Sequence, residues 1–134
     1  TEESELSQAV SLSTAAARTE MMVATVDEGT AYAAAIPGVP VAGKTGTAQL
    51  YTANGKAIDE GHYCVSFAGF APADKPELCA IVVVDDPHAP QSELLGGVLA
   101  GPIFAQLMKQ CLEQVAVARN DGPARTAMAR GGAR

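Results

Sequence analysis

The sequence predicts a mixed α/β fold, in which three antiparallel strands pack with an upstream helix and a C-terminal helix. Two segments with helical periodicity flank three short segments of strand character, and the short connections between those strands favour an antiparallel meander. With 134 residues the chain is long enough for one core, because single domains most often contain roughly 100 to 150 residues. We therefore expect one domain, or a part of one, over residues 13–117.

The first predicted element is a helix over residues 13–28. Apolar or small residues recur there at intervals of three and four, and Ser13 and Gly29 are suitable residues to begin and end the helix. The periodic positions are Ala15, Ala16, Thr19, Met22, Val23 and Val26. Residues 1–12 form an acidic lead that we expect to be poorly ordered.

Three strand segments follow the first helix. Residues 39–50 contain Lys44-Thr45-Gly46-Thr47, and Asn54-Gly55 marks a loop that reaches residue 61. Residues 62–71 alternate between larger apolar and smaller residues, and Gly69 within them indicates a close backbone approach. After a turn at residues 72–76, residues 78–84 are continuously apolar, which is typical of a central strand covered on both faces.

The last predicted element is an amphipathic helix over Leu94–Ala116, which we expect to lie across the sheet. Its apolar stripe consists of Ile103, Phe104, Leu107, Met108, Cys111, Leu112 and Val115. Pro102 leaves the start of this helix uncertain. Residues 118–134 are rich in Ala, Arg and Gly without periodicity, which predicts a disordered tail.

Composition and charge narrow the function classes. The net charge is −6, and because residues 119–134 carry +3, the rest of the chain carries −9, which argues against nucleic-acid binding. No apolar run of about 18 residues is present. Cys64, Cys79 and Cys111 are predicted to be free thiols; they lack metal-ligand spacing, and no cofactor is predicted. In the predicted hairpin, Cys64 lies opposite residue 84 and Cys79 opposite residue 69. His62 and His88 are lone histidines for which a structural role is expected.

Residues 38–45 match the phosphate-loop pattern G-x-x-x-x-G-K-[ST], and an acidic pair, Asp85-Asp86, follows the third strand. A nucleotide-binding module is therefore one alternative. The backbone opposes it, because Val39 and Val41 resist positive φ and Pro40 has no N–H to donate. No apolar helical stripe follows Lys44, although a phosphate loop opens a helix.

The same stretch can instead be a strand that binds an anionic acyl substrate. Lys44 supplies a positive charge for a carboxylate, the Thr45 and Thr47 hydroxyls can donate hydrogen bonds, and Gly46 lets a ligand lie against the backbone. Strict alternation places the two threonines on the opposite face of the strand from Lys44, so this interpretation requires twist or a bulge. The free N–H groups of an edge strand can also pair with an extended peptide.

The motifs along the chain resemble those of one enzyme family. Val41-Ala42-Gly43-Lys44-Thr45-Gly46-Thr47-Ala48-Gln49 is similar to the K-T-G signature of penicillin-binding proteins. The surrounding segments that match in order are Met21-Met22-Val23, Glu28-Gly29-Thr30, Ile36-Pro37-Gly38, Phe67-Ala68-Gly69-Phe70-Ala71-Pro72, Gly96-Gly97 and Ala100-Gly101-Pro102-Ile103-Phe104. Residues 7–116 thus resemble the C-terminal part of a class B penicillin-binding protein transpeptidase domain.

The resemblance implies the C-terminal portion of the serine β-lactamase and penicillin-binding transpeptidase fold. It implies a peptidoglycan D,D-transpeptidase that cross-links stem peptides through an acyl-serine intermediate and is acylated by β-lactams. In that case Lys44 joins the proton-relay and anion-binding network, Thr45 and Thr47 face the substrate carboxylate, and the Thr47 N–H serves the oxyanion hole. Gly46 is where a side chain would most plainly obstruct the substrate. The alternative within the resemblance is a serine β-lactamase or a β-lactam sensor domain.

The chain lacks the nucleophile of this family. None of the serines at positions 4, 7, 11, 13, 66 and 92 has a lysine three residues later, and S-x-N is absent. We therefore expect residues 1–134, which begin at Thr1, to be inactive alone. An N-terminal remainder of the same enzyme would carry both motifs, as a partner, and a membrane anchor at the periplasmic face of the bacterial inner membrane.

Overall fold

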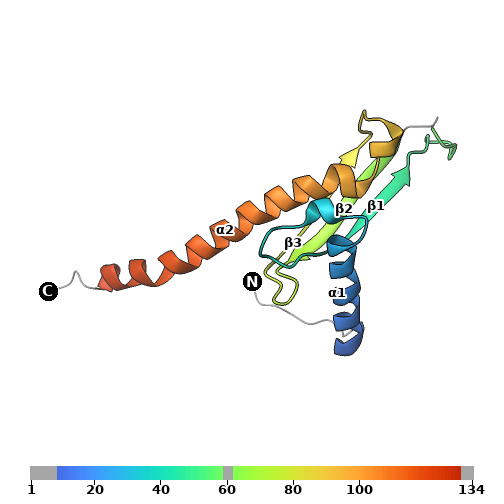
Figure 1. Cartoon of the computed structure of the whole chain (residues 1–134). Coiled ribbons are helices and arrows are strands. Elements are labelled where there is room, and N and C mark those ends of the chain that lie inside the picture. The colour runs from blue at the N-terminus through green and yellow to red at the C-terminus, as the bar shows by residue number, and fades with distance from the viewer. Residues whose placement is uncertain (1–8, 59–61, 131–134) are drawn as a thin grey trace.

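The computed structural model describes residues 9–58 and 62–130 and has the predicted order of helix, three strands and helix (Figure 1). The elements are α1 (Leu12–Asp27), the short 3-10 helix η1 (Tyr32–Ala34), β1 (Ala42–Gln49), β2 (Tyr63–Ala71), β3 (Leu78–Asp85), the 3-10 helix η2 (Gln91–Glu93) and α2 (Gly96–Arg130). The mixed α/β class with three antiparallel strands and two α-helices is confirmed.

Helix α1 begins one residue before the predicted start. Ser11, rather than Ser13, is its N-cap, and the Ser11 side chain accepts a hydrogen bond from the Thr14 N–H. The helix ends at Asp27, and the backbone N–H of the C-cap Glu28 donates to the Ala24 carbonyl, so Gly29 lies just beyond the cap. Val26 is the one fully buried residue of α1, and the remainder of the predicted apolar stripe is half-buried or exposed.

The sheet has the order β1–β2–β3 with antiparallel pairing throughout. Strand β1 starts at Ala42 rather than Val39, because Val39 donates its N–H to the Ile36 carbonyl and closes a turn. The β2–β3 register differs from the prediction by one residue: Cys64 lies opposite Asp85, and Cys79 opposite Phe70. All three cysteines are free.

Strand β3 is not covered on both faces as its apolar sequence predicted. It is an edge strand of the described sheet, and its residues alternate between half-buried and exposed. Ile81 and Val83 are 65% and 54% exposed on the face opposite α2. The continuous apolar composition of residues 78–84 predicted a strand buried on both faces. In the described chain, only the face of β3 towards α2 is partly buried.

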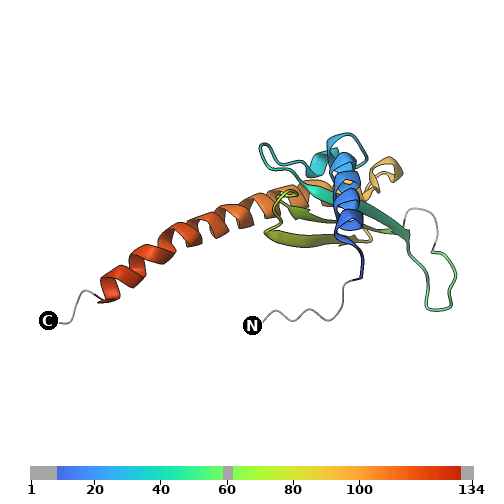
Figure 2. The same ribbon diagram turned by 90° about the horizontal axis from the view of Figure 1, so that it is seen from below.

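Helix α2 lies across the other face of the sheet (Figures 1 and 2). Phe67 of β2 and Phe104 of α2 meet edge to face, with ring centroids 4.7 Å apart and ring planes at 67°. Both rings are fully buried together with Met108. Gly69 approaches its neighbours closely, as predicted, since an added Cβ would lie 2.7 Å from the Ala42 carbonyl oxygen.

The boundaries of α2 differ from the prediction at both ends. The helix starts at Gly96 rather than Leu94, and it continues to Arg130, so residues 118–130, for which we predicted disorder, are helical. Ala and Arg are strong helix formers, whereas Gly122 and Pro123 within this stretch are unfavourable in a helix interior, so propensity alone does not account for the continuation. Cys111 is exposed rather than part of the core. No described helix combines the length and the hydropathy needed to cross a membrane.

Candidate active site on strand β1

The Lys44–Thr47 segment lies in the middle of β1, at one edge of the sheet. One side of β1 pairs with β2, and no strand in the described part of the chain pairs with its other side. Lys44 is opposite Ala68, Thr45 opposite Phe67, and Thr47 opposite Val65. Because Phe67 and Val65 point into the core, both threonines share the face covered by α2, and Lys44 starts from the opposite face.

Lys44 reaches the threonine face by bending around the open edge of the strand. Its Nζ donates a 2.8 Å hydrogen bond to the Thr45 carbonyl oxygen and lies 3.3 Å from Thr45 Oγ1. The pairing of β1 with β2 is continuous from residue 42 to residue 49, so the bulge considered from the sequence is absent. The flexible lysine stem itself brings the ammonium group to the Thr45 hydroxyl.

The Lys44 ammonium forms no ion pair with a carboxylate in the described residues, where the ion pairs are His62–Asp86 and Arg119–Glu77. The side chain is exposed. A positive charge beside a hydroxyl group, at an unpaired strand edge, is suited to an anionic ligand such as a carboxylate.

A second hydroxyl group lies behind Thr45. Thr30, which follows α1, places its Oγ1 3.4 Å from Thr45 Oγ1. Thr30 was not identified as a site residue from the sequence, although it belongs to the Glu28-Gly29-Thr30 segment of the resemblance. Fifteen residues separate the two threonines, and only the packing of α1 beside β1 brings them together.

Gly46 is enclosed on both faces of the sheet. A Cβ on Gly46 would lie 2.5 Å from the Ser66 hydroxyl oxygen on one face. On the other face the first turn of α2 contacts the Gly46 backbone through Gly96. A side chain at Gly46 would therefore require the Ser66 hydroxyl to rotate away, whereas the contact with Gly96 involves the backbone of β1.

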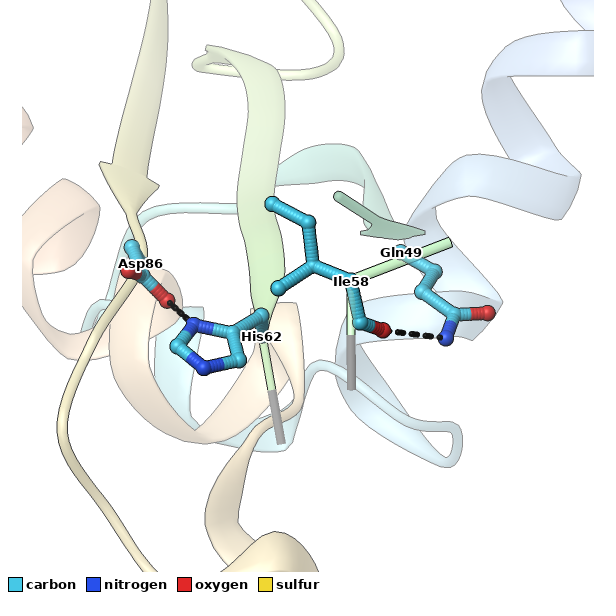
Figure 3. A network of polar contacts seen from close by, with 4 residues as sticks. All are labelled: Gln49, Ile58, His62 and Asp86. Atoms are coloured by element: carbon cyan, nitrogen blue, oxygen red, sulfur yellow. Dashed lines mark hydrogen bonds and ion pairs between the residues drawn. The ribbon is translucent and has the colours of Figure 1, made fainter. Parts of the chain in front are cut away.

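One polar contact joins the loop after β1 to the residue that follows β3, and a second lies between the end of β1 and that loop (Figure 3). His62 Nδ1 lies 2.8 Å from Asp86 Oδ1, with both side chains about two-fifths exposed, and Gln49 Nε2 donates to the Ile58 carbonyl at 3.4 Å. The sequence gives no sign of this pair, because Asp86 lies 24 positions after His62 and only the sheet brings the two together. Asp86 has a φ of 48° in the left-handed region.

The fold contradicts the phosphate-loop interpretation. Residues from Ala42 onwards are extended and pair with β2, so no helix follows Lys44 to direct its N-terminus at a phosphate. Asp86, the second residue of the acidic pair after the third strand, contacts His62. The described residues also contain no group of three or more His, Cys, Asp or Glu arranged for a metal ion.

Comparison with known proteins places the chain in a family. Residues 1–109 match the model of the penicillin binding protein transpeptidase domain. The chain is 44% identical over 92 residues to stage V sporulation protein D of Bacillus subtilis, an alignment that covers 69% of this chain and 14% of that protein. It is 38% identical over 109 residues to the probable peptidoglycan D,D-transpeptidase PenA of Neisseria flavescens, covering 81% of this chain and 26% of that protein.

Solved structures agree with this placement. The apo form of penicillin-binding protein 3 from Mycobacterium tuberculosis superposes with a TM-score of 0.70 at 31% identity, covering 87% of this chain and 28% of that one. The transpeptidase domain of the FtsI4 D,D-transpeptidase from Legionella pneumophila gives a TM-score of 0.64 at 32% identity, with coverages of 77% and 37%. The chain thus spans well under half the length of these relatives. It belongs to the penicillin-binding protein transpeptidase domain family.

Proposed function

We propose that this chain is the C-terminal part of a peptidoglycan D,D-transpeptidase, in which β1 forms one wall of the acyl-transfer site. The observation that carries the proposal is the position of Lys44-Thr45-Gly46-Thr47 on an open strand edge, with the lysine ammonium beside the Thr45 hydroxyl. Membership of the family and relatives named as D,D-transpeptidases support the same reaction.

In the proposed reaction, a serine Oγ attacks the penultimate D-Ala carbonyl of a stem peptide, and the C–N bond to the terminal D-Ala breaks. The departing D-Ala amine takes up a proton, and the acyl group then passes from the serine to the amine of a neighbouring stem. Lys44 and the Thr45 and Thr47 hydroxyls bind the terminal carboxylate. The Thr47 N–H stabilises the oxyanion, and the open edge of β1 pairs with the extended stem peptide.

The serine nucleophile and its activating lysine lie on polypeptide outside residues 1–134, because no serine of this chain precedes a lysine by three positions. That polypeptide also supplies the S-x-N motif and completes the site as a partner of this chain. Residues 1–134 are consequently inactive alone. We place the complete enzyme in the bacterial cell envelope, at the periplasmic face of the inner membrane, where β-lactams acylate it as analogues of the stem peptide.

A fluorescent penicillin tests this proposal. The complete enzyme is labelled, digested and mapped by mass spectrometry, and the label is expected on a serine outside residues 1–134. No label on the complete enzyme, or a label on any of the six serines of this chain, would overturn the proposal.

The rate of deacylation separates a transpeptidase from a β-lactamase. After removal of free penicillin, the acyl-enzyme of a cross-linking enzyme persists, whereas a β-lactamase releases hydrolysed antibiotic in repeated turnovers. Release of D-Ala from a stem pentapeptide, with a second stem as acceptor, then measures the proposed reaction itself. Rapid turnover of penicillin without D-Ala release would favour the β-lactamase alternative.

A further inference from the structure

The first turn of α2 contacts the backbone of β1 at the signature motif. A Cβ on Gly96 would overlap the Ser66 carbonyl oxygen and would lie 2.6 Å from the carbonyl oxygen and 3.1 Å from the amide nitrogen of Gly46. These neighbours are backbone atoms of paired strands, so no side-chain rotation can make room. The closeness of α2 and β1 therefore depends on the absence of a side chain at Gly96.

Gly97 makes the adjacent contact. A Cβ there would overlap the Thr30 carbonyl oxygen and would lie 3.3 Å from Thr45 Cγ2. Thr30 in turn places its hydroxyl 3.4 Å from the Thr45 hydroxyl. The start of α2 thus contacts both Thr30 and Thr45, and these two threonines contact each other.

Helix α2 is anchored to the sheet by the core and cannot easily move away from β1. Leu94 just before the helix is 3% exposed, and Ala100 and Phe104 are fully buried in the next two turns. Well-packed interiors resist even small displacements. A methyl group at either glycine would consequently press on the motif strand or on Thr30 and Thr45 behind it.

We propose that Gly96, Gly97 and Thr30 are positioning residues for the acyl-transfer site. Thr30 contacts both Gly97 and Thr45. The first turn of α2, which has no side chain at Gly96 or Gly97, sets the position of β1 at Thr45 and Gly46. It thereby sets the position of the following Thr47 N–H. This inference rests on the proposed function, and it assigns a role to residues that do not touch the substrate. Because acyl transfer is sensitive to displacements below 1 Å, the chemical step should respond more than substrate binding.

The test uses the complete enzyme and a fluorescent penicillin under single-turnover conditions, which separates the acylation rate constant, Kd and the number of active sites. Gly96→Ala and Gly97→Ala are expected to lower the acylation rate constant by about 10- to 100-fold, with the full number of sites still acylated at the end. The matched control is Gly101→Ala on the same helix, whose Cβ would lie 3.3 Å from the Ala34 amide nitrogen of η1, away from β1. Its rate constant should stay within about threefold of wild type.

The number of acylated sites distinguishes positioning from a folding defect. A wild-type rate constant in Gly96→Ala and Gly97→Ala would overturn the inference, and so would fewer acylated sites with a wild-type rate constant. An unlabelled wild-type enzyme would instead contradict the proposed function, so the two failures differ.

A second variant keeps the test decisive if both alanine variants fail to fold. Thr30→Val retains the shape of Thr30 but removes the hydroxyl facing Thr45, and it is expected to lower the acylation rate constant by about two- to tenfold, with recovery in Thr30→Ser. Thr25→Val is the control, because the Thr25 hydroxyl donates to the Met21 carbonyl within α1. Equal acylation rate constants for Thr30→Val and wild type would overturn the inference.

Discussion

At the residue scale, the conformation of Lys44 determines what β1 offers to a ligand. Strand alternation alone would direct its ammonium group away from both threonines, yet Nζ lies within 3.3 Å of Thr45 Oγ1. The chain reaches this arrangement because β1 has an open edge for the lysine stem to bend around. A central strand with the same sequence could not place the charge there.

Lys44→Ala in the complete enzyme should lower the acylation efficiency for penicillin by about 10- to 100-fold, because a hydrogen bond to a charged group contributes about 1.5–3 kcal/mol. Lys56→Ala, which removes an exposed lysine from the loop after β1, serves as the matched control and should retain wild-type efficiency. The melting temperature checks that both variants are folded. Equal efficiency of Lys44→Ala and wild type would contradict the assigned role.

The backbone at Asp86 leads to a prediction about stability. Its φ of 48° is unfavourable for L-residues and easy for glycine, whereas its ion pair with His62 is largely solvated and contributes at most about 1 kcal/mol. Asp86→Gly and Asp86→Ala both lose the pair, but the glycine also relieves the backbone. We expect Asp86→Ala to be about 1 kcal/mol less stable than Asp86→Gly in thermal unfolding.

Asp85 provides the control for Asp86, because it is the last residue of β3 and its backbone is extended. There the order should reverse, with glycine less stable than alanine by about 0.5–1 kcal/mol. The same order at both positions would show that the left-handed backbone at Asp86 has no measurable effect.

The motif residues could be identified from the sequence, but the residues that contact them could not. Lys44 to Thr47 are contiguous and carry a recognisable pattern, so they could be identified without a structure. Thr30, Ser66 and Gly96 contact the motif only through the packing of α1, β2 and α2 against β1. Thr30 and Gly96 belong to segments that match the family, but the sequence does not show that they touch the motif. The His62–Asp86 pair likewise depends on the β2–β3 register.

At the scale of elements, only part of the apolar stripe of α2 is buried against the sheet. Phe104 and Met108, one turn apart, are buried, whereas Ile103 and Leu107 on the neighbouring line are 50% and 43% exposed. The sequence predicted all of them in one stripe, because amphipathicity reports which residues are apolar and not how wide the facing surface is. Likewise, an Ala- and Arg-rich tail without periodicity gave no sign that α2 would continue to Arg130.

Removal of the Phe104 ring tests this packing directly. Phe104→Ala eliminates the edge-to-face contact with Phe67 and leaves a cavity, so it should destabilise the protein by about 3–5 kcal/mol. The adjacent Ile103→Ala should cost less than about 1 kcal/mol, since Ile103 is already half exposed. Chemical unfolding of both variants measures the difference. Similar losses of stability at the two positions would mean that the side of α2 with Ile103 and Leu107 is also buried in the complete enzyme.

At the scale of the whole molecule, the described chain covers only one face of its sheet. Helix α2 occupies that face (Figure 2). The opposite face presents Ile81 and Val83 beside Ala68, which is also exposed. Contiguous exposed apolar surface of this kind promotes association. We expect the polypeptide that carries the serine to cover this face in the complete enzyme.

Residues 1–134 expressed alone should therefore associate through the open face, and light scattering after size exclusion should give a mass above 13.7 kDa. Ile81→Lys combined with Val83→Lys places two charges on that face and should shift the mass towards 13.7 kDa. Val117→Lys is the matched control, because Val117 is 53% exposed on α2, away from the open face, and its substitution should leave the association unchanged. If the unmodified chain is instead monomeric and stable, the open face needs no covering, and residues 1–134 would form an independent unit rather than part of a larger transpeptidase.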